Sequence, residues 1–517
     1  MSNPTRRDLL RDVGTGMFVA SLGPAVAADL GLGLAHAADA PDRLTFGDLD
    51  PLVGFIQDTP ADRLLPLALE KLRTGTDLKR LVAAAALANA RAFGGEDYVG
   101  FHTLMALVPA FHMAAEMPAD RRPLPVLKVL VRNATRLTET GGKPDALQPV
   151  TPAASGATAE RLRDAVRRGD RQAAERTFAA LTRDPLANTL DDLMLVVDDA
   201  TEVHRTVLVS RSWDLIDFVG RERAGHLLRQ SVRFCLSAEK NPNYVKHYQE
   251  VRTLLPKLLD AHKLADKPLG HRSVEDAWVE RFGDTLFRGT PAQAAEAAAA
   301  ALADGIDPAA VGEAVSLTAN QLVLRDEGRP KSQASPGKPV GSCHGDSIGV
   351  HACDSVNAWR NIARHGGPRT AASSLILAAY QVASDRTNRG GDFHGWKPYP
   401  RPEHIDQVRE VGTTSLLPGL DRSIRDKDQG RAAALTSLIV HERTNPTEEV
   451  FALLRRYAVS EDGALHAEKF YRTTVEEYTA ARPAFKNRYI VALARVTASS
   501  FGTPAPGYAE ACRLLKV

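Results

Sequence analysis

The fold class is decided by stretches such as residues 307–324, which read DPAAVGEAVSLTANQLVL. Asp307 is a residue type that caps helices well, and Pro308 suits the first helical position. Val311, Val315 and Leu322 then recur at intervals of four and seven residues, which is the spacing of one face of an α-helix. The stretch therefore predicts a capped helix over residues 308–324.

The same periodicity covers nearly the whole chain, whereas alternating patterns rich in Val, Ile and Thr are almost absent. A second capped start is Asn445-Pro446, where Glu448 can complete the cap. The expected helices are 63–91, 96–117, 123–139, 158–168, 171–183, 189–219, 221–238, 244–263, 291–304, 308–324, 354–365, 371–384, 428–442, 446–458, 463–481 and 484–500. We predict an all-α fold of layered or stacked antiparallel helix pairs, because many connections are short.

Three interruptions suggest how the chain is organised. Residues 141–158 contain three prolines and look like a linker between an N-terminal helical region, 38–141, and a central one, 158–325. The C-terminal region is 326–517, and the three regions can also form one continuous domain. The loops 328–353 and 386–402 are long and contain histidine, cysteine and aromatic residues, a composition that favours functional loops over disordered ones.

Composition excludes several classes of function. The formal charge is only +2 over 517 residues and the two signs are interleaved, which argues against a nucleic-acid binder. Beyond residue 37 no continuous apolar run reaches the roughly 18 residues that span a bilayer. The four cysteines do not form a disulfide scaffold, although Cys343 and Cys353 could close a small loop, and no Cys-x-x-Cys pair is present.

The densest group of reactive side chains is residues 343–354, CHGDSIGVHACD. On a helix starting near His351, that imidazole shares a face with Trp359 and points toward the core. We interpret His351 as a metal or cofactor ligand or a general base, the alternative being a structural histidine. His344 lies one heptad earlier and can join it in catalysis only if the loop folds back.

Other candidates lie on helices and in the second loop. His394 and Trp396 belong to the loop motif GGDFHGW. His394 is a candidate catalytic or metal-binding residue. Trp396 and Trp359 are candidate cofactor-binding residues whose rings could line a pocket. His102 and His204 are candidate metal ligands on helices, with a structural role as the alternative. We interpret Asp198, Asp199 and Glu202 as a solvated face rather than a metal site. His466 lies one turn before Phe470 and receives no role.

Motifs for other chemistries are missing or weak. The chain has no Walker sequence, no Rossmann fingerprint and no His-Glu-x-x-His. Residues 345–349, GDSIG, match the Gly-x-Ser-x-Gly pattern of serine hydrolases, but the residues before them make a poor strand. A hydrolase using Ser347 is therefore the weaker alternative function.

The first 37 residues combine Thr5-Arg6-Arg7-Asp8-Leu9 with a Gly/Ala-rich apolar stretch and the small-x-small pattern Ala35-His36-Ala37. They resemble a twin-arginine (Tat) export signal, with Leu9 where Phe is usual and Arg11 where Lys is usual. The resemblance implies a bacterial protein that the Tat machinery exports in the folded state to the periplasm or beyond. Many such proteins carry a cofactor.

Residues 350–360, VHACDSVNAWR, resemble the late His-containing helix of questin-oxidase-like proteins, which are helical and include Baeyer-Villiger-type oxidation enzymes. This resemblance covers about a dozen residues and implies an oxidation site that includes His351. We therefore expect an exported oxidoreductase that binds a metal, haem or organic cofactor, and a small-molecule substrate, between helices through His351, His394, His102 and His204. The competing hypothesis is a non-catalytic periplasmic interaction protein whose histidines are structural.

Overall fold

A computed structural model describes residues 43–142, 145–412, 415–442 and 447–517. These residues fold into α-helices and short 3-10 turns, and pairing of the β type among them is limited to three isolated bridges. The prediction of an all-α fold is confirmed. The export signal predicted at residues 1–37 and the cap predicted at Asn445-Pro446 lie outside the described residues.

Residues 46–517 form one compact unit, and the description below concerns this unit. Its first helices are α3 (Asp50–Asp58), α4 (Ala61–Arg73), α5 (Leu78–Phe93), α6 (Tyr98–Glu116) and α7 (Leu124–Glu139). The next are α8 (Ala159–Arg167), α9 (Arg171–Leu181), α10 (Leu186–Val197), α11 (Val203–Asp214), α12 (Ile216–Val219), α13 (Ala224–Glu239), α14 (Pro242–His247) and α15 (Gln249–Ala261). The remaining ones are α16 (Asp276–Arg288), α17 (Pro291–Ala303), α18 (Pro308–Arg325), α19 (Ile348–His365), α20 (Pro368–Arg389), α21 (Pro402–Asp406), α22 (Leu416–Arg425), α23 (Gln429–Glu442), α24 (Thr447–Ser460), α25 (His466–Ala480), α26 (Asn487–Ser500) and α27 (Tyr508–Leu515).

The helix predicted from residues 307–324 is α18. The Asp307 carboxylate accepts the backbone N–H of Ala309, and Pro308 is the first helical residue. This geometry satisfies one of the N–H groups that a helix start leaves without an intrahelical partner. The helix is buried along most of its length, with Val311, Val315 and Leu322 fully inside the core.

Three helices predicted as continuous are in fact broken. Residues 63–91 divide between α4 and α5 near Gly75, which has φ +99°, and 244–263 divide at Tyr248. The predicted helix 189–219 is broken between α10 and α11, where the Glu202 side chain accepts the N–H of Arg205 and caps α11. Apolar spacing continues across each break, so periodicity alone does not reveal it.

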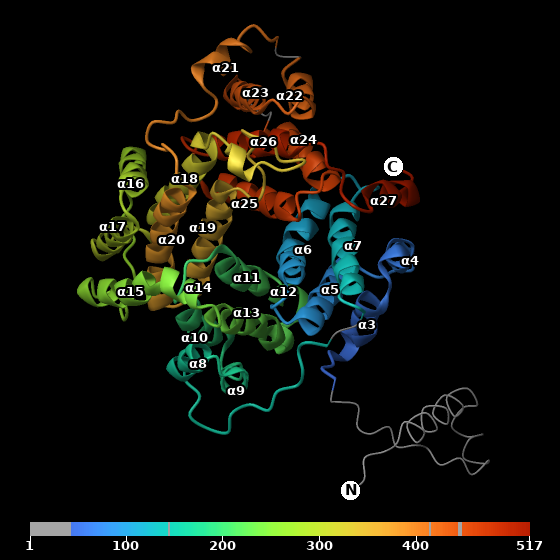
Figure 1. Ribbon diagram of the computed structural model, residues 1–517, viewed down its shortest axis with the longest axis vertical. Coiled ribbons are helices and arrows are strands. Elements are labelled where there is room, and N and C mark those ends of the chain that lie inside the picture. The colour runs from blue at the N-terminus through green and yellow to red at the C-terminus, as the bar shows by residue number, and fades with distance from the viewer. Residues whose placement is uncertain (1–42, 143–144, 413–414, 443–446) are drawn as a thin grey trace, which may run out of the picture. The chain divides into compact units, whose positions relative to one another are not determined.

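Four helices from distant parts of the sequence surround the middle of the unit (Figure 1). Helix α6 packs on α11, α11 on α19, α19 on α25 and α25 back on α6, so the four close a ring. By length and composition α6 is the one helix in the described ranges that could cross a membrane, yet 72% of its most apolar window is buried. It packs here as a core helix.

The cysteine thiols are free. Cys235, Cys343 and Cys353 are buried, and Cys512 is partly exposed. The disulfide considered between Cys343 and Cys353 is therefore not formed. Cys353 lies inside α19, while Cys343 precedes the helix, and its backbone N–H is held by the Ser499 hydroxyl.

Candidate functional site: a cluster of four histidines

Each helix of the central ring contributes one histidine to a common cluster: His102 from α6, His204 from α11, His351 from α19 and His466 from α25. The Nε2 atoms of His102 and His204 are 3.1 Å apart, and those of His351 and His466 are 3.0 Å apart. The two pairs also touch each other. Ring centroids are separated by 5.1 Å for His102 and His466 and by 5.8 Å for His204 and His351.

All four histidines lie within the first five residues of their helices, and side-chain caps start two of these helices, α6 and α11. The Asp97 carboxylate caps α6 through the N–H of Gly100, and Glu202 caps α11. The positive ends of four helix dipoles therefore point at the cluster. Such an environment disfavours protonation of the imidazoles and keeps the rings neutral.

The outer nitrogens of three rings are held by acceptors. Nδ1 of His102 donates to the carbonyl of Tyr98 at 2.7 Å, and Nδ1 of His466 to the carbonyl of Gly463 at 3.2 Å. Nδ1 of His204 lies 2.6 Å from a Glu202 carboxylate oxygen. Carbonyl and carboxylate oxygens only accept, so these three Nδ1 atoms carry the proton and their neutral rings turn Nε2 lone pairs toward the cluster.

The contact between His102 and His204 is consequently unfavourable for two neutral rings, because two lone pairs meet. It becomes favourable if His204 takes a second proton or if a cation lies between the rings. One proton satisfies only one pair of nitrogens, whereas an ion could be shared by all four. A histidine whose Nδ1–H is held by a carboxylate or a backbone carbonyl is the usual arrangement around a bound metal.

Burial lowers the pKa of three histidines in the cluster, His102, His351 and His466. It lowers the pKa of His351 to about 3, with the nearby charge of Lys469 as the next cause, and it lowers the pKa values of His102 and His466 in the same way. Lys469 is itself buried on α25, which lowers its pKa to about 8, while Asp354 and Glu468 oppose the shift. Burial would raise the Glu202 pKa, but His204 and the cap hydrogen bonds lower it below its usual value.

Two aromatic rings of α6 pack against the cluster. The Tyr98 ring lies 4.4 Å from that of His102 and 5.7 Å from that of His204, measured between centroids. Phe101 lies 5.0 and 5.2 Å from the same two rings. Tyr98 is 59% exposed, and the His204 side chain is itself 13% exposed, so the cluster reaches the surface beside these rings.

A buried network of ion pairs holds the turn that precedes Glu202. Asp199 is bonded by Arg163 and Arg167 of α8, and Asp198 is bonded by Arg369 of α20 at 3.0 Å. Both aspartates are 1% exposed. The prediction of a solvated acidic face was therefore wrong, because arginines from distant helices cover these carboxylates.

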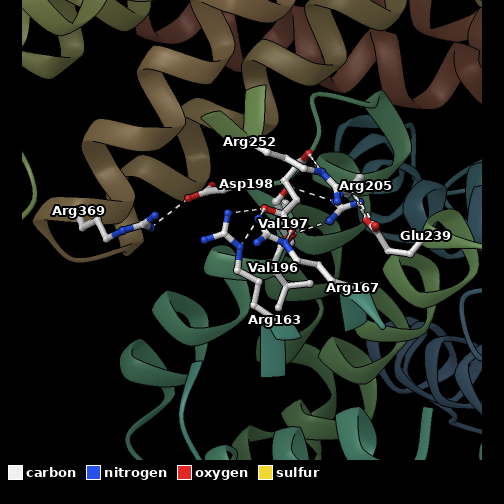
Figure 2. A network of polar contacts seen from close by, with 10 residues as sticks. Arg163, Arg167, Val196, Val197, Asp198, Arg205, Glu239, Arg252 and Arg369 are labelled. Carbon is white, nitrogen blue, oxygen red and sulfur yellow. Dashed lines mark hydrogen bonds and ion pairs between the residues drawn. The ribbon is translucent and has the colours of Figure 1, made fainter. Parts of the chain in front are cut away.

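Figure 2 shows how the same network continues into α11. Arg205 donates to the carbonyls of Val196 and Val197, the last residues of α10, at 2.6 and 3.0 Å. It also faces Glu239, which pairs with Arg252 at 2.6 Å. The ends of α10 and α11 are thus tied together beside the Glu202 carboxylate.

The structure brings His102, His204 and His351 together and leaves other predicted site residues elsewhere. The His394 ring lies 5.7 Å from that of Phe287 and outside the cluster. Trp359 is fully buried and donates to Gln381 at 2.8 Å, while Trp396 packs on Phe393.

Two polar candidates next to α19 have other surroundings. His344 is 9% exposed, its Nε2 has no hydrogen-bond partner within the described ranges, and burial lowers its pKa to about 4. The Ser347 hydroxyl lies 3.5 Å from Sγ of Cys343. No strand precedes Ser347 in the described residues 326–347, so the strand-to-helix turn of a nucleophile elbow is missing.

Sequence reasoning missed His466, Glu202 and Lys469. His466 begins a helix that the periodicity did predict, but its partners lie more than a hundred residues away. As the rings stand, no group of three or more His, Cys, Asp or Glu side chains in the described ranges has the arrangement of a metal site. Comparison of the chain with protein-family models, with curated proteins and with solved structures finds no match.

Proposed function

We propose that this protein is an exported oxidoreductase that binds one first-row transition-metal ion through the Nε2 atoms of His102, His204, His351 and His466. The observation that carries the proposal is the meeting of two pairs of Nε2 atoms at the centre of four packed helices, with each ring coming from a different helix. Imidazole is a ligand that suits iron, copper, nickel and zinc.

The distances within each histidine pair are close to those between two ligands of one ion. With metal–nitrogen bonds of 2.0–2.1 Å, tetrahedral ligands place their nitrogens about 3.3 Å apart and their ring centroids about 5.2 Å apart. The observed nitrogen separations are 3.0 and 3.1 Å, and the four ring separations run from 4.7 to 5.8 Å. The rings as they stand form no metal site in the described ranges, so the two pairs would have to move together to form one ligand set.

The residues around the rings have defined tasks in this proposal. Glu202 and the carbonyls of Tyr98 and Gly463 hold three imidazoles in the tautomer that can ligate. A redox-active ion, when bound, would exchange electrons with the substrate. Lys469, with its pKa near 8, can take up or release a proton close to neutral pH beside the site.

Metal analysis of the purified protein tests the proposal. We expect about one equivalent of iron, copper or another redox-active ion by elemental analysis, with an absorption band that changes on reduction. His102→Ala or His466→Ala should lose the ion, whereas His394→Ala, outside the cluster, should keep it. A folded protein that stays metal-free, and whose thermal stability does not respond to added ions, would instead support a non-catalytic helical protein.

The export part of the proposal rests on the signal-like residues 1–37. Replacing Arg6 and Arg7 together by Lys should retain the protein in the cytoplasm if the Tat machinery carries it. Cell fractionation followed by immunoblotting measures this. Unchanged appearance of the double variant in the periplasm would contradict the assignment without affecting the proposed metal site.

A further inference from the structure

A groove with a volume of about 560 Å³ lies between α16, α18 and the end of the loop that precedes α21. Its apolar wall consists of Val279 and Phe287 from α16 and of Leu317 and Leu324 from α18, all of them buried. Pockets that take organic molecules usually measure roughly 300–1,000 Å³ and are lined mainly by apolar side chains with a few polar groups. The groove therefore has room for an organic ligand with an apolar part.

Arg325, the last residue of α18, lines this groove with a charge that lacks a counter-ion. Its Nε donates to the side-chain oxygen of Gln321 at 2.9 Å, and its Nη1 donates to the carbonyl of Trp396 at 2.8 Å. Within the described residues it pairs with no carboxylate, and its Nη2 makes no hydrogen bond. Burial lowers the pKa of Arg325, with Asp284 opposing the shift and Arg288 adding to it. An anion in the groove would stabilise this partly buried charge.

Gln321 supplies a second hydrogen-bond donor one helical turn before Arg325. Because a guanidinium only donates, the Gln321 side-chain oxygen is the atom that faces Arg325. The amide nitrogen of Gln321 then has no acceptor among the described residues. Nη2 of Arg325 and Nε2 of Gln321 can therefore donate to the two oxygens of one carboxylate.

The acidic residues of the groove do not neutralise Arg325. Glu280 pairs with Arg488, and Asp284 pairs with Arg288 at 3.3 Å. Three arginines and two carboxylates line the groove, so their charges leave an excess of one positive charge. This excess matches a ligand with a single negative charge better than a phosphate ester, which carries up to two.

We propose that the groove binds a carboxylic acid with an apolar body. The carboxylate accepts hydrogen bonds from Arg325 and Gln321, and the apolar body lies against Phe287 and Leu317. None of these residues belongs to the histidine cluster, so the proposal does not depend on the metal ion of the proposed function. Failure of the ion to bind would leave this site unaffected.

The loop at residues 386–402, which the sequence predicts to be functional, contributes to the groove through its backbone. The carbonyl of Trp396 positions Arg325, and the N–H of Tyr399 donates to the carbonyl of Leu324 at 2.8 Å. Tyr399 lines the groove, whereas His394 does not. The loop thus shapes the site without the histidine that its sequence suggests.

Isothermal titration calorimetry of the purified protein with octanoate tests the proposal. We expect octanoate to bind at a single site. Octanol, which lacks the charge, and acetate, which lacks the apolar body, should bind at least roughly ten-fold more weakly. No binding of octanoate at millimolar concentration, or equally tight binding of octanol, would overturn the proposal.

Two variants locate the site. Gln321→Glu is nearly isosteric and gives Arg325 a carboxylate one turn away on the same helix, so octanoate binding should be lost while the melting temperature stays the same or rises. Arg325→Gln removes the guanidinium and should weaken octanoate binding roughly ten-fold or more. The matched control is Arg513→Gln, which removes the same charge from an exposed position on α27 and should bind octanoate like the parent protein. Octanoate that binds Gln321→Glu as tightly as the parent would overturn the assignment.

Discussion

At the scale of single residues, the decisive side chain is Glu202. One of its oxygens caps α11 through the N–H of Arg205, and the other holds Nδ1 of His204. A single carboxylate thus starts the helix and selects the tautomer of the histidine two residues later. Apolar spacing does not reveal this role of Glu202, because a cap residue lies outside the periodic pattern.

We expect Glu202→Gln to weaken metal binding by roughly 10–100-fold, the usual cost of losing an outer partner of a ligating histidine. Its amide oxygen can still cap the helix, so folding should change little. Competition with a chelator of known affinity measures the loss. Asp77→Asn, which alters the cap of the distant α5, is the control and should bind the ion normally. If Glu202→Gln bound the ion as tightly as the parent protein, Glu202 would have no role in metal binding.

The buried histidines also set how stability depends on pH. The folded-state pKa of His351 is about 3, below the ordinary value of 6.5, so between these values the unfolded chain binds a proton that the native metal-free protein does not. The free energy of unfolding should therefore fall as pH drops below about 6, by up to about 1.4 kcal/mol per pH unit for each such histidine.

Urea denaturation of the metal-free protein at several pH values between 7 and 4 measures this slope. His351→Gln should reduce the slope of the free energy of unfolding against pH by the contribution of one histidine, while His394→Gln should leave the slope unchanged. A slope that is the same in both variants would show that His351 already titrates normally in the folded protein.

At the scale of elements, close approach of a loop to α25 positions His466. A Cβ atom on Gly345 would lie 2.5 Å from Cβ of His466, so only glycine lets the loop before α19 pass this point. The loop before α19 and the first turn of α25 must therefore pack closely before His351 and His466 can come into contact. This contact joins residues far apart in the sequence and has no local signature.

Gly345→Ala should displace the first turn of α25, lower the free energy of unfolding by about 1–3 kcal/mol as other overpacked sites do, and reduce metal content. Gly412→Ala is the matched control, because a Cβ there meets nothing within 4 Å. Denaturant titration and elemental analysis of both variants measure the effects. Normal metal content in Gly345→Ala would mean that α25 absorbs the extra methyl without moving His466.

At the scale of the whole molecule, the cluster adds contacts between helices that ion pairs such as Arg360–Glu477 and Arg211–Glu476 also link. His102 and His204 are 102 residues apart, and His351 and His466 are 115 apart. A bound ion would close large loops between these four helices and stabilise the native state in proportion to its affinity and concentration.

Removing the ion with a chelator should lower the melting temperature by several degrees, because an ion present at a thousand times its dissociation constant adds about 4 kcal/mol to the stability of the native state. Differential scanning calorimetry of chelated and loaded protein measures the shift. The His466→Ala variant should show no shift, and a shift of equal size in that variant would place the stabilising ion somewhere else.

The sequence by itself determined the fold class, the cap at Asp307 and three of the clustered histidines as candidates, because periodicity, capping and side-chain chemistry are local properties. It could not separate His394 from His466, since both lie near aromatic residues and only long-range packing distinguishes them. Nor could it show that Asp198 and Asp199 are covered by arginines from α8 and α20. Those outcomes depend on how distant helices meet, and only the tertiary structure decided them.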